Sequence, residues 1–163
     1  MGSGRSGKYY TSHGSRAIHH DAIIHSMEGS YTEGNRMKSG GHGQDAISYM
    51  DKNGIEYNIV KTYPNGVRIG NVPNHMLRFK RNGNGQAWFP KEWTQKDIVA
   101  AAEHVIGLKS NSHKPEGTTL YGQWKDVKIC VIRRNGSIAS VYPNYNQSCK
   151  KRRRLNNEQR SIQ

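Results

Sequence analysis

The sequence predicts a single domain of the α+β class, in which short N-terminal helices and a glycine-rich loop pack with antiparallel sheets. Apolar residues recur at helical spacing near the N-terminus and again after Thr94. Two turns that contain Asn-Gly, at residues 64–66 and 134–136, each join two alternating runs. These elements do not alternate as strand, helix and strand, so an α+β arrangement is favoured over a parallel sheet.

We expect three segments along the 163 residues: a flexible lead at 1–14, a folded domain at 15–147 and a basic tail at 148–163. The domain begins with an amphipathic helix from Ser15 to Met27, which Gly29 ends. Residues 28–43 form a loop, and 46–50 form a short helix or strand.

The middle of the domain is predicted to contain a hairpin, with strands at 55–63 and 67–72. Residues 73–86 are less regular and carry a basic group and a glycine loop. A helix follows Thr94, which forms a weak variant of a capping box with Asp97, and Gly107 ends this helix. Three antiparallel strands, at 118–124, 127–133 and 137–142, complete the domain.

The charge of the chain favours a polyanionic partner. Its formal net charge is +13 and its pI is about 9.9. Residues 150–163 contain six Lys or Arg and one Glu, so they contribute +5 and the rest of the chain +8. Nucleic acid is the leading candidate, and an acidic protein also fits. No run of 18 apolar residues predicts a membrane span, and Cys130 and Cys149 form neither a disulfide framework nor a zinc site.

The segment from His25 to His42 is the candidate functional site. Histidine titrates near neutral pH, so two histidines on one loop can supply a base and an acid together. The residues between them are polar and rich in glycine, which indicates an exposed loop. A surface or structural role is the alternative for any one of the eight histidines in the chain.

Four motifs in this order resemble the EndoU endoribonuclease family, most closely its bacterial toxin domains. A first histidine is followed by a glycine four residues on, as in His25-Ser26-Met27-Glu28-Gly29, and a second follows Gly-Gly, as in Gly40-Gly41-His42. An aromatic-Phe-Pro-Lys segment opens a helix at 88–93, and the last hairpin ends in Ser140-Val141-Tyr142-Pro143. The resemblance covers roughly residues 20–146 and implies an EndoU-like nuclease fold.

The resemblance implies a metal-independent cleavage of RNA. His25 is then the general base that takes the proton of a 2′-hydroxyl, and His42 the general acid that protonates the leaving 5′-oxygen. Ser140 and Tyr142 correspond to the residues that hold the base and ribose; the alternative for Tyr142 is a packing role before Pro143. No metal or other cofactor is required, because the nucleophile belongs to the substrate.

The chain departs from the family at the third catalytic residue, a lysine. Spacing from the Phe-Pro segment places that lysine near residues 84–86, where this chain has none. We expect Lys80 to replace it, with Arg81 and Lys91 as further substrate-binding cations. The two histidines are also two residues further apart than is usual, so a changed substrate, DNA included, stays open.

The resemblance further implies the toxin domain of a larger secreted protein, which acts in the cytoplasm of a competitor cell and is neutralised by an acidic immunity protein. Two alternatives remain open. One is a metal-dependent nuclease that uses His19, His20, Asp21 and His25, although neighbouring helical positions point about 100° apart. The other is a module that binds nucleic acid without cleaving it.

Overall fold

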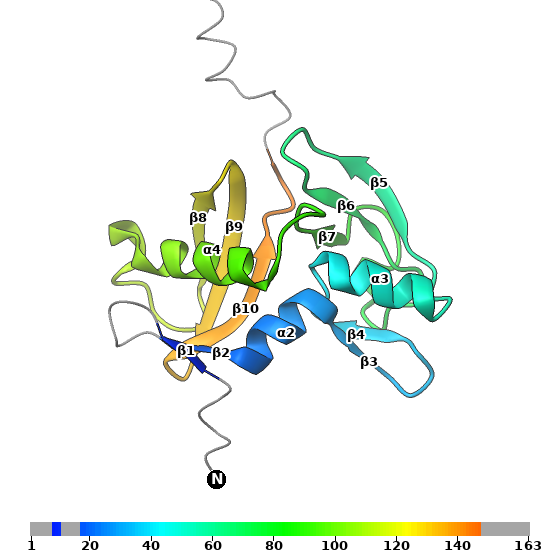
Figure 1. The fold of residues 1–163 in the computed structure, drawn as a ribbon, viewed down its shortest axis with the longest axis horizontal. Helices are drawn as coiled ribbons and strands as arrows, with labels where there is room; N and C mark the ends of the chain where they lie inside the picture. The colour runs from blue at the N-terminus through cyan, green and yellow to red at the C-terminus, as the bar shows by residue number, and fades with distance from the viewer. Residues whose placement is uncertain (1–7, 11–16, 148–163) are drawn as a thin grey trace, which may run out of the picture.

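The fold is described for residues 8–10 and 17–147 in a computed structural model (Figure 1). It is an α+β fold with three sheets, as the sequence predicts. The first half contains β1 (Lys8–Tyr10), β2 (Ala17–His19), α2 (His20–Glu28), β3 (Ser30–Tyr31), β4 (Met37–Ser39), α3 (Gln44–Lys52), β5 (Asn58–Thr62) and β6 (Arg68–Asn71). The second half contains the 3₁₀ helix η1 (Arg78–Lys80), β7 (Gln86–Trp88), α4 (Gln95–Gly107), η2 (Lys109–Asn111), β8 (Thr119–Trp124), β9 (Val127–Arg134) and β10 (Ser137–Pro143).

The largest sheet has five strands in the order β1-β2-β10-β9-β8. Its three C-terminal strands are antiparallel, as predicted, whereas β2 pairs with β10 in parallel. Helix α4 crosses one face of β8, β9 and β10 (Figure 1). A Cβ atom on Gly122 of β8 would lie 2.8 Å from a methyl group of Val105, so close packing of α4 requires glycine there. The other face of these strands is left for the cavity described below.

A three-stranded sheet in the order β5-β6-β7 lies beside α3 (Figure 1). One buried cluster joins this sheet to the five-stranded sheet, since it contains residues of α2, α4 and β8–β10 together with Ile69 of β6 and Ala87 of β7. A second cluster lies under α3 and includes Met50 and the fully buried Trp88. Strand β7 therefore contributes to both cores.

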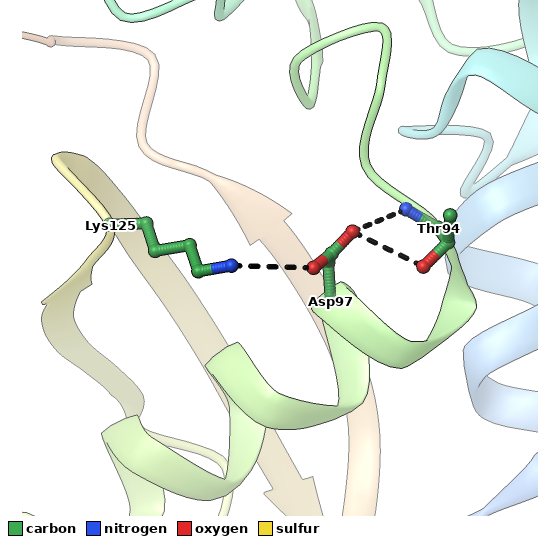
Figure 2. Close-up of polar contacts among 3 residues, drawn as sticks. All are labelled: Thr94, Asp97 and Lys125. Atoms are coloured by element: carbon green, nitrogen blue, oxygen red, sulfur yellow. Dashed lines mark hydrogen bonds and ion pairs between the residues drawn. The ribbon is translucent and has the colours of Figure 1, made fainter.

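Helix α4 begins with the capping arrangement that the sequence predicts. The carboxylate of Asp97 accepts hydrogen bonds from the backbone N–H of Thr94 at 2.8 Å and from its hydroxyl at 3.2 Å (Figure 2). The same carboxylate lies 3.8 Å from the ammonium of Lys125 in the β8–β9 turn. Asp97 thus joins the start of α4 to the sheet that the helix covers.

The N-terminal region differs from the prediction. The helix expected from Ser15 to Met27 begins only at His20, because Ala17–His19 form β2 along the edge of β10, with Ala17 opposite Ser137. Lys8–Tyr10, expected in the flexible lead, form β1. Pairing between distant strands has overridden the local helical pattern here. The rest of the lead and the basic tail from 148, with Cys149, lie outside the described residues.

Two further differences concern short elements. Residues 46–50 are helical, as part of α3, which resolves the open choice between helix and strand. Gln86–Trp88, expected only as the approach to α4, form β7, and all three residues are buried. Within the described part of the chain, no helix is long and apolar enough to cross a membrane.

Candidate active site

A cavity of about 730 Å³ lies between the end of α2, the loop before α3, η1 and the free face of β8–β10. Five of the residues singled out from the sequence line it: His25, His42, Lys80, Ser140 and Tyr142. They come from four separate parts of the chain. The described residues that line this cavity include no Asp or Glu, so its charge comes from cationic and titratable nitrogen groups.

Backbone hydrogen bonds hold the two histidine segments side by side. The carbonyl groups of residues 25, 26 and 27, in the last turn of α2, accept hydrogen bonds from the N–H groups of residues 41, 42 and 43. The bonds to His25 and Met27 are both 3.0 Å long. Carbonyl groups at the end of a helix lack partners within the helix, and the loop provides partners for these three; the His25 carbonyl also accepts from the N–H of Gly29 at 2.9 Å. This arrangement places His42 beside the turn that carries His25.

Gly40 is the point at which the loop comes closest to His25. Its φ is +69°, and a Cβ atom there would lie 2.3 Å from the carbonyl oxygen of His25 and 2.7 Å from Nε2 of its ring. Both the backbone angle and the space require glycine. The glycine of the Gly-Gly-His motif therefore has a steric function, which is to leave room for the other histidine.

The His25 ring is half-buried. Its Nδ1 shares a hydrogen bond of 3.0 Å with the hydroxyl of Ser30, the first residue of β3. Burial lowers the pKa of His25 below its ordinary value of 6.5. The Ser30 hydroxyl binds one ring nitrogen, and the other, Nε2, lies close to Gly40.

His42 lies deeper, with 7% of its surface exposed. Its Nδ1 is 2.8 Å from the carbonyl oxygen of Ala87 on β7, and because a carbonyl can only accept, Nδ1 carries the hydrogen. Burial, followed by the nearby charge of Lys80, lowers the pKa of His42 to about 3. The ring is therefore neutral at pH 7, with its lone pair on Nε2.

Lys80 provides the fixed positive charge of the cavity. Its ammonium donates a hydrogen bond to Oε1 of Gln86 at 2.8 Å and approaches the Tyr145 hydroxyl at 3.4 Å. Burial lowers its pKa to about 8, so it is mostly protonated at pH 7. No carboxylate of the described residues pairs with it. A buried ammonium with neutral partners is suited to bind an anion.

Gln86 joins Lys80 to the histidine loop. It is fully buried on β7, and its amide Nε2 donates to the carbonyl oxygens of Gly40 at 3.2 Å and Gly41 at 3.1 Å. Gln86 also lies in the segment where the family spacing places lysine. The structure thus has a glutamine there, and that glutamine holds the ammonium that arrives from Lys80 of η1.

Ser140 and Tyr142 line the cavity from the same face of β10, two residues apart. The rings of Tyr142 and His42 are 5.5 Å apart with an interplanar angle of 34°. The N–H of Val141, the residue between Ser140 and Tyr142, donates a hydrogen bond to the buried hydroxyl of Ser26 at 3.2 Å. This bond fastens α2 to β10 and so holds the histidine segments against the strand that carries Tyr142.

The structure does not bring Arg81 and Lys91 to this cavity. The guanidinium of Arg81 donates to the carbonyl oxygens of His75 at 2.7 Å and Met76 at 3.1 Å, so it braces the loop before η1. Lys91 is exposed in the turn after Pro90. Neither is among the residues that line the cavity.

Three of the four residues of the alternative metal site, His19, His20 and Asp21, have side chains outside the described set, so this alternative stays open. Among the described residues, no group of three His, Cys, Asp or Glu side chains could hold a metal ion. His25, the fourth residue, shares a hydrogen bond with Ser30.

Sequence reasoning missed several residues of the cavity. Gln86 and Tyr145 bind the Lys80 ammonium, and Ser30 binds His25, yet none of them belongs to a recognisable motif. The only indication for Gln86 in the sequence is its position, because it lies in the segment where the family spacing places the catalytic lysine. Phe79, next to Lys80, also lines the cavity and has no sequence feature that separates it from a core residue.

One comparison with known proteins identifies a family. The family model described as "Bacterial EndoU nuclease" matches residues 19–145, which include every residue that lines the cavity except Asn146. No curated protein and no solved structure matches the chain.

Proposed function

The chain belongs to the bacterial EndoU nuclease family, and we propose that it is an endoribonuclease that uses a ribose 2′-hydroxyl as the nucleophile. One observation carries this proposal: two imidazoles and one ammonium line a single cavity whose described lining has no carboxylate. Such a set can accept a proton, donate a proton and neutralise a phosphate. Carboxylates, which are the principal protein ligands of Mg²⁺ and Ca²⁺, are not among these lining residues.

The proposed reaction is an internal transesterification. The 2′-oxygen forms a bond to phosphorus as its proton passes to one imidazole. The bond from phosphorus to the 5′-oxygen breaks, and the other imidazole gives that oxygen a proton. The products are a 2′,3′-cyclic phosphate and a 5′-hydroxyl. The ammonium of Lys80 would stabilise the charge on the phosphorane, and Ser140 and Tyr142 would hold the attacking nucleotide.

The electrostatics favour an exchange of the two roles that we expected from the sequence. His42 is buried beside Lys80 and neutral, with the lone pair on Nε2, which suits the general base. His25 is less buried and has no such charge against it, so the negative charge of a bound phosphate can more readily raise its pKa and keep it protonated. We therefore propose His42 as the base and His25 as the acid.

The test compares RNA and DNA oligonucleotides of one sequence, in excess EDTA, with the products identified by mass. We expect RNA cleavage to a cyclic phosphate, and none when the attacking nucleotide is 2′-deoxy. His42→Ala is expected to abolish cleavage and retain RNA binding. Cleavage of the DNA that EDTA abolishes would replace the proposal with the metal-dependent alternative. RNA binding without cleavage by the wild type would favour the binding module.

We further propose that the nuclease acts as a toxin in the cytoplasm of a competitor cell, delivered as part of a larger protein. The resemblance to bacterial toxin domains supports this, and the charge of +13 favours an acidic immunity protein as partner. Induced expression inside a bacterium is expected to degrade RNA and stop growth, and His42→Ala is expected to relieve both effects. Normal growth with active wild-type nuclease present would contradict the toxin role.

A further inference from the structure

Phe79 is the most exposed large hydrophobic side chain of the described residues, with 64% of its surface accessible. The other phenylalanine, Phe89, is completely buried. Phe79 also lines the cavity that holds the two histidines, as do the partly exposed Leu77 on the same segment and Tyr121 on β8. An apolar rim around a charged cavity indicates a ligand with both apolar and anionic parts.

The segment that presents Phe79 is held firmly. The N–H of Leu77 donates to Nδ1 of the fully buried His75 at 2.9 Å, and Arg81 binds two carbonyl groups of the same turn. The N–H of Val72 donates to the Lys80 carbonyl at 2.9 Å. Gly85 passes so close that a Cβ atom there would lie 2.1 Å from the carbonyl oxygen of Phe79. These contacts fix the backbone of the turn that carries the exposed Phe79 ring.

The position of the Phe79 ring beside the Lys80 ammonium indicates which kind of ligand fits the cavity. The ammonium of Lys80 lies 5.7 Å from the centroid of the Phe79 ring. A phosphate bound by Lys80 would thus have an aromatic face next to it, and a phosphate with an adjacent planar base is a nucleotide. The bases of single strands stack on such rings, whereas paired bases are already stacked within a helix.

A second aromatic position lies on the opposite wall. Tyr121, Cys130 and Tyr142 face one another across β8, β9 and β10, so they form one row along the sheet. Tyr142 is the half-buried member, next to His42, and Tyr121 is the exposed member, with 54% of its surface accessible. The cavity therefore has an inner aromatic group at the histidines and an outer pair at its mouth.

We propose that Phe79, with Tyr121 opposite, binds the base of the nucleotide on the 3′ side of the scissile phosphate, and that the substrate is single-stranded RNA. This inference rests on the proposed function, because it assumes that the phosphate lies at Lys80. Tyr142 then holds the attacking nucleotide and Phe79 the leaving one. A stacked base on each side fixes the phosphate between the histidines, and a duplex cannot present both bases in this way.

The test uses RNA oligonucleotides with a single cleavage site and a second version that lacks the base of the 3′ nucleotide. Phe79→Ala is expected to lower kcat/KM about 5- to 100-fold on the intact RNA, the range that one stacked base contributes. On the abasic RNA the variant and the wild type are expected to be equal. Phe79→Trp retains a π-face and is expected to keep most of the activity. Val60→Ala removes an exposed apolar group of β5 and serves as the matched control.

Binding is measured separately, with His42→Ala protein and RNA that is 2′-deoxy at the attacking nucleotide. The Phe79→Ala change is expected to weaken binding of the single strand and to have little effect on a duplex of the same sequence. Equal losses on the intact and abasic RNA, or no loss on either, overturn the inference. This binding assay does not require cleavage. A protein in which Phe79 binds the base but no RNA is cut therefore gives a different result from a nuclease in which Phe79 does not bind the base.

Discussion

The ammonium of Lys80 and the side-chain oxygen of Gln86 are 2.8 Å apart, and the amide nitrogen of the same glutamine holds the two glycines before His42. One buried side chain therefore sets the position of the cation relative to the histidine loop. The arrangement explains how Lys80 of η1, which precedes the position expected for the family's lysine, can supply the charge.

Gln86→Leu is expected to lower kcat for RNA cleavage by about 10- to 100-fold, with a smaller change in KM. Leucine is close to glutamine in size, but it removes the partner that Gln86 provides to Lys80 and to the carbonyls of Gly40 and Gly41. Buried polar groups without partners cost about 1–3 kcal/mol each, so the melting temperature is also expected to fall. Gln86→Glu is the stringent comparison, because its carboxylate pairs with Lys80 and repels the two carbonyls. Full activity in both variants would show that the cation does not depend on this residue.

Gly40→Ala is expected to abolish most RNA cleavage, because the added Cβ would occupy the space of the His25 ring and carbonyl. Gly83→Ala is the matched control. Its φ of +60° carries a similar backbone cost of about 1 kcal/mol, but no atom lies within 4 Å of the added Cβ. Both variants are expected to unfold at lower temperature, and only Gly40→Ala to lose activity beyond the fraction unfolded. Equal activities would remove the steric function assigned to Gly40.

Activity is expected to decline as the pH rises above about 8. The pKa of Lys80 is lowered to about 8 by burial, so the ammonium loses its charge there. Lys80→Arg keeps the charge at higher pH, and its alkaline decline is expected to shift upward even if its maximum rate is lower. The measurement is kcat/KM against pH for both proteins. An unchanged alkaline limb in Lys80→Arg would assign the decline to another group.

The same titration predicts the opposite trend for stability. The unfolded chain keeps the proton on Lys80 up to an ordinary pKa of 10.5, whereas the folded chain loses it near 8. The unfolded state therefore binds more protons between these values, and the contribution of Lys80 to stability rises with pH. We expect the free energy of unfolding of the wild type to rise relative to Lys80→Met over this range. Activity is expected to fall with pH while this contribution to stability rises. A loss of activity that comes from deprotonation of Lys80 can therefore be distinguished from unfolding.

Asp97→Ala is expected to destabilise the fold by about 1 kcal/mol and to lower the melting temperature by about 2–4 °C, without changing RNA cleavage. The change removes the acceptor for the Thr94 N–H and hydroxyl at the start of α4, on the far side of the sheet from the cavity (Figure 2). Lys125→Ala removes the exposed ion pair at 3.8 Å and the contact of the ammonium with the Trp124 ring at 4.6 Å, and it is expected to have a smaller effect than Asp97→Ala. A loss of cleavage in Asp97→Ala would show that α4 controls the cavity.

Strong local patterns account for what could be predicted from the sequence. The Asn-Gly turns defined the hairpins β5–β6 and β9–β10, and Thr94 with Asp97 defined the start of α4. Strands β2 and β7 have three residues each, too few for any period to be visible, and β2 lies beside β10, which is distant in sequence. Both were missed for that reason.

Because β7 was not predicted, part of the site was not predicted either: β7 carries Gln86 and the Ala87 carbonyl that binds His42. Family motifs located the histidines, Ser140 and Tyr142 in the cavity, where the structure also places them. The same reasoning chose Lys80 as the replacement for the family lysine, but it also expected Arg81 and Lys91 at the substrate, and of the three only Lys80 lines the cavity. The course of the glycine loop, which the sequence does not show, decides which cation turns inward. Exposure alone separates Phe79 from Phe89, and a sequence does not reveal exposure.

The bond between the hydroxyl of Ser26 and the backbone of Val141 spans 115 positions of the chain. It means that the wall of the cavity that carries Ser140 and Tyr142 reaches the histidines only after β10 has returned to α2, almost a full domain later in synthesis. Contacts of such long range form late, since a large loop must close before they contribute. The unfolded chain therefore carries every side chain of the cavity without the cavity itself, and the chemistry of the site waits for this loop to close.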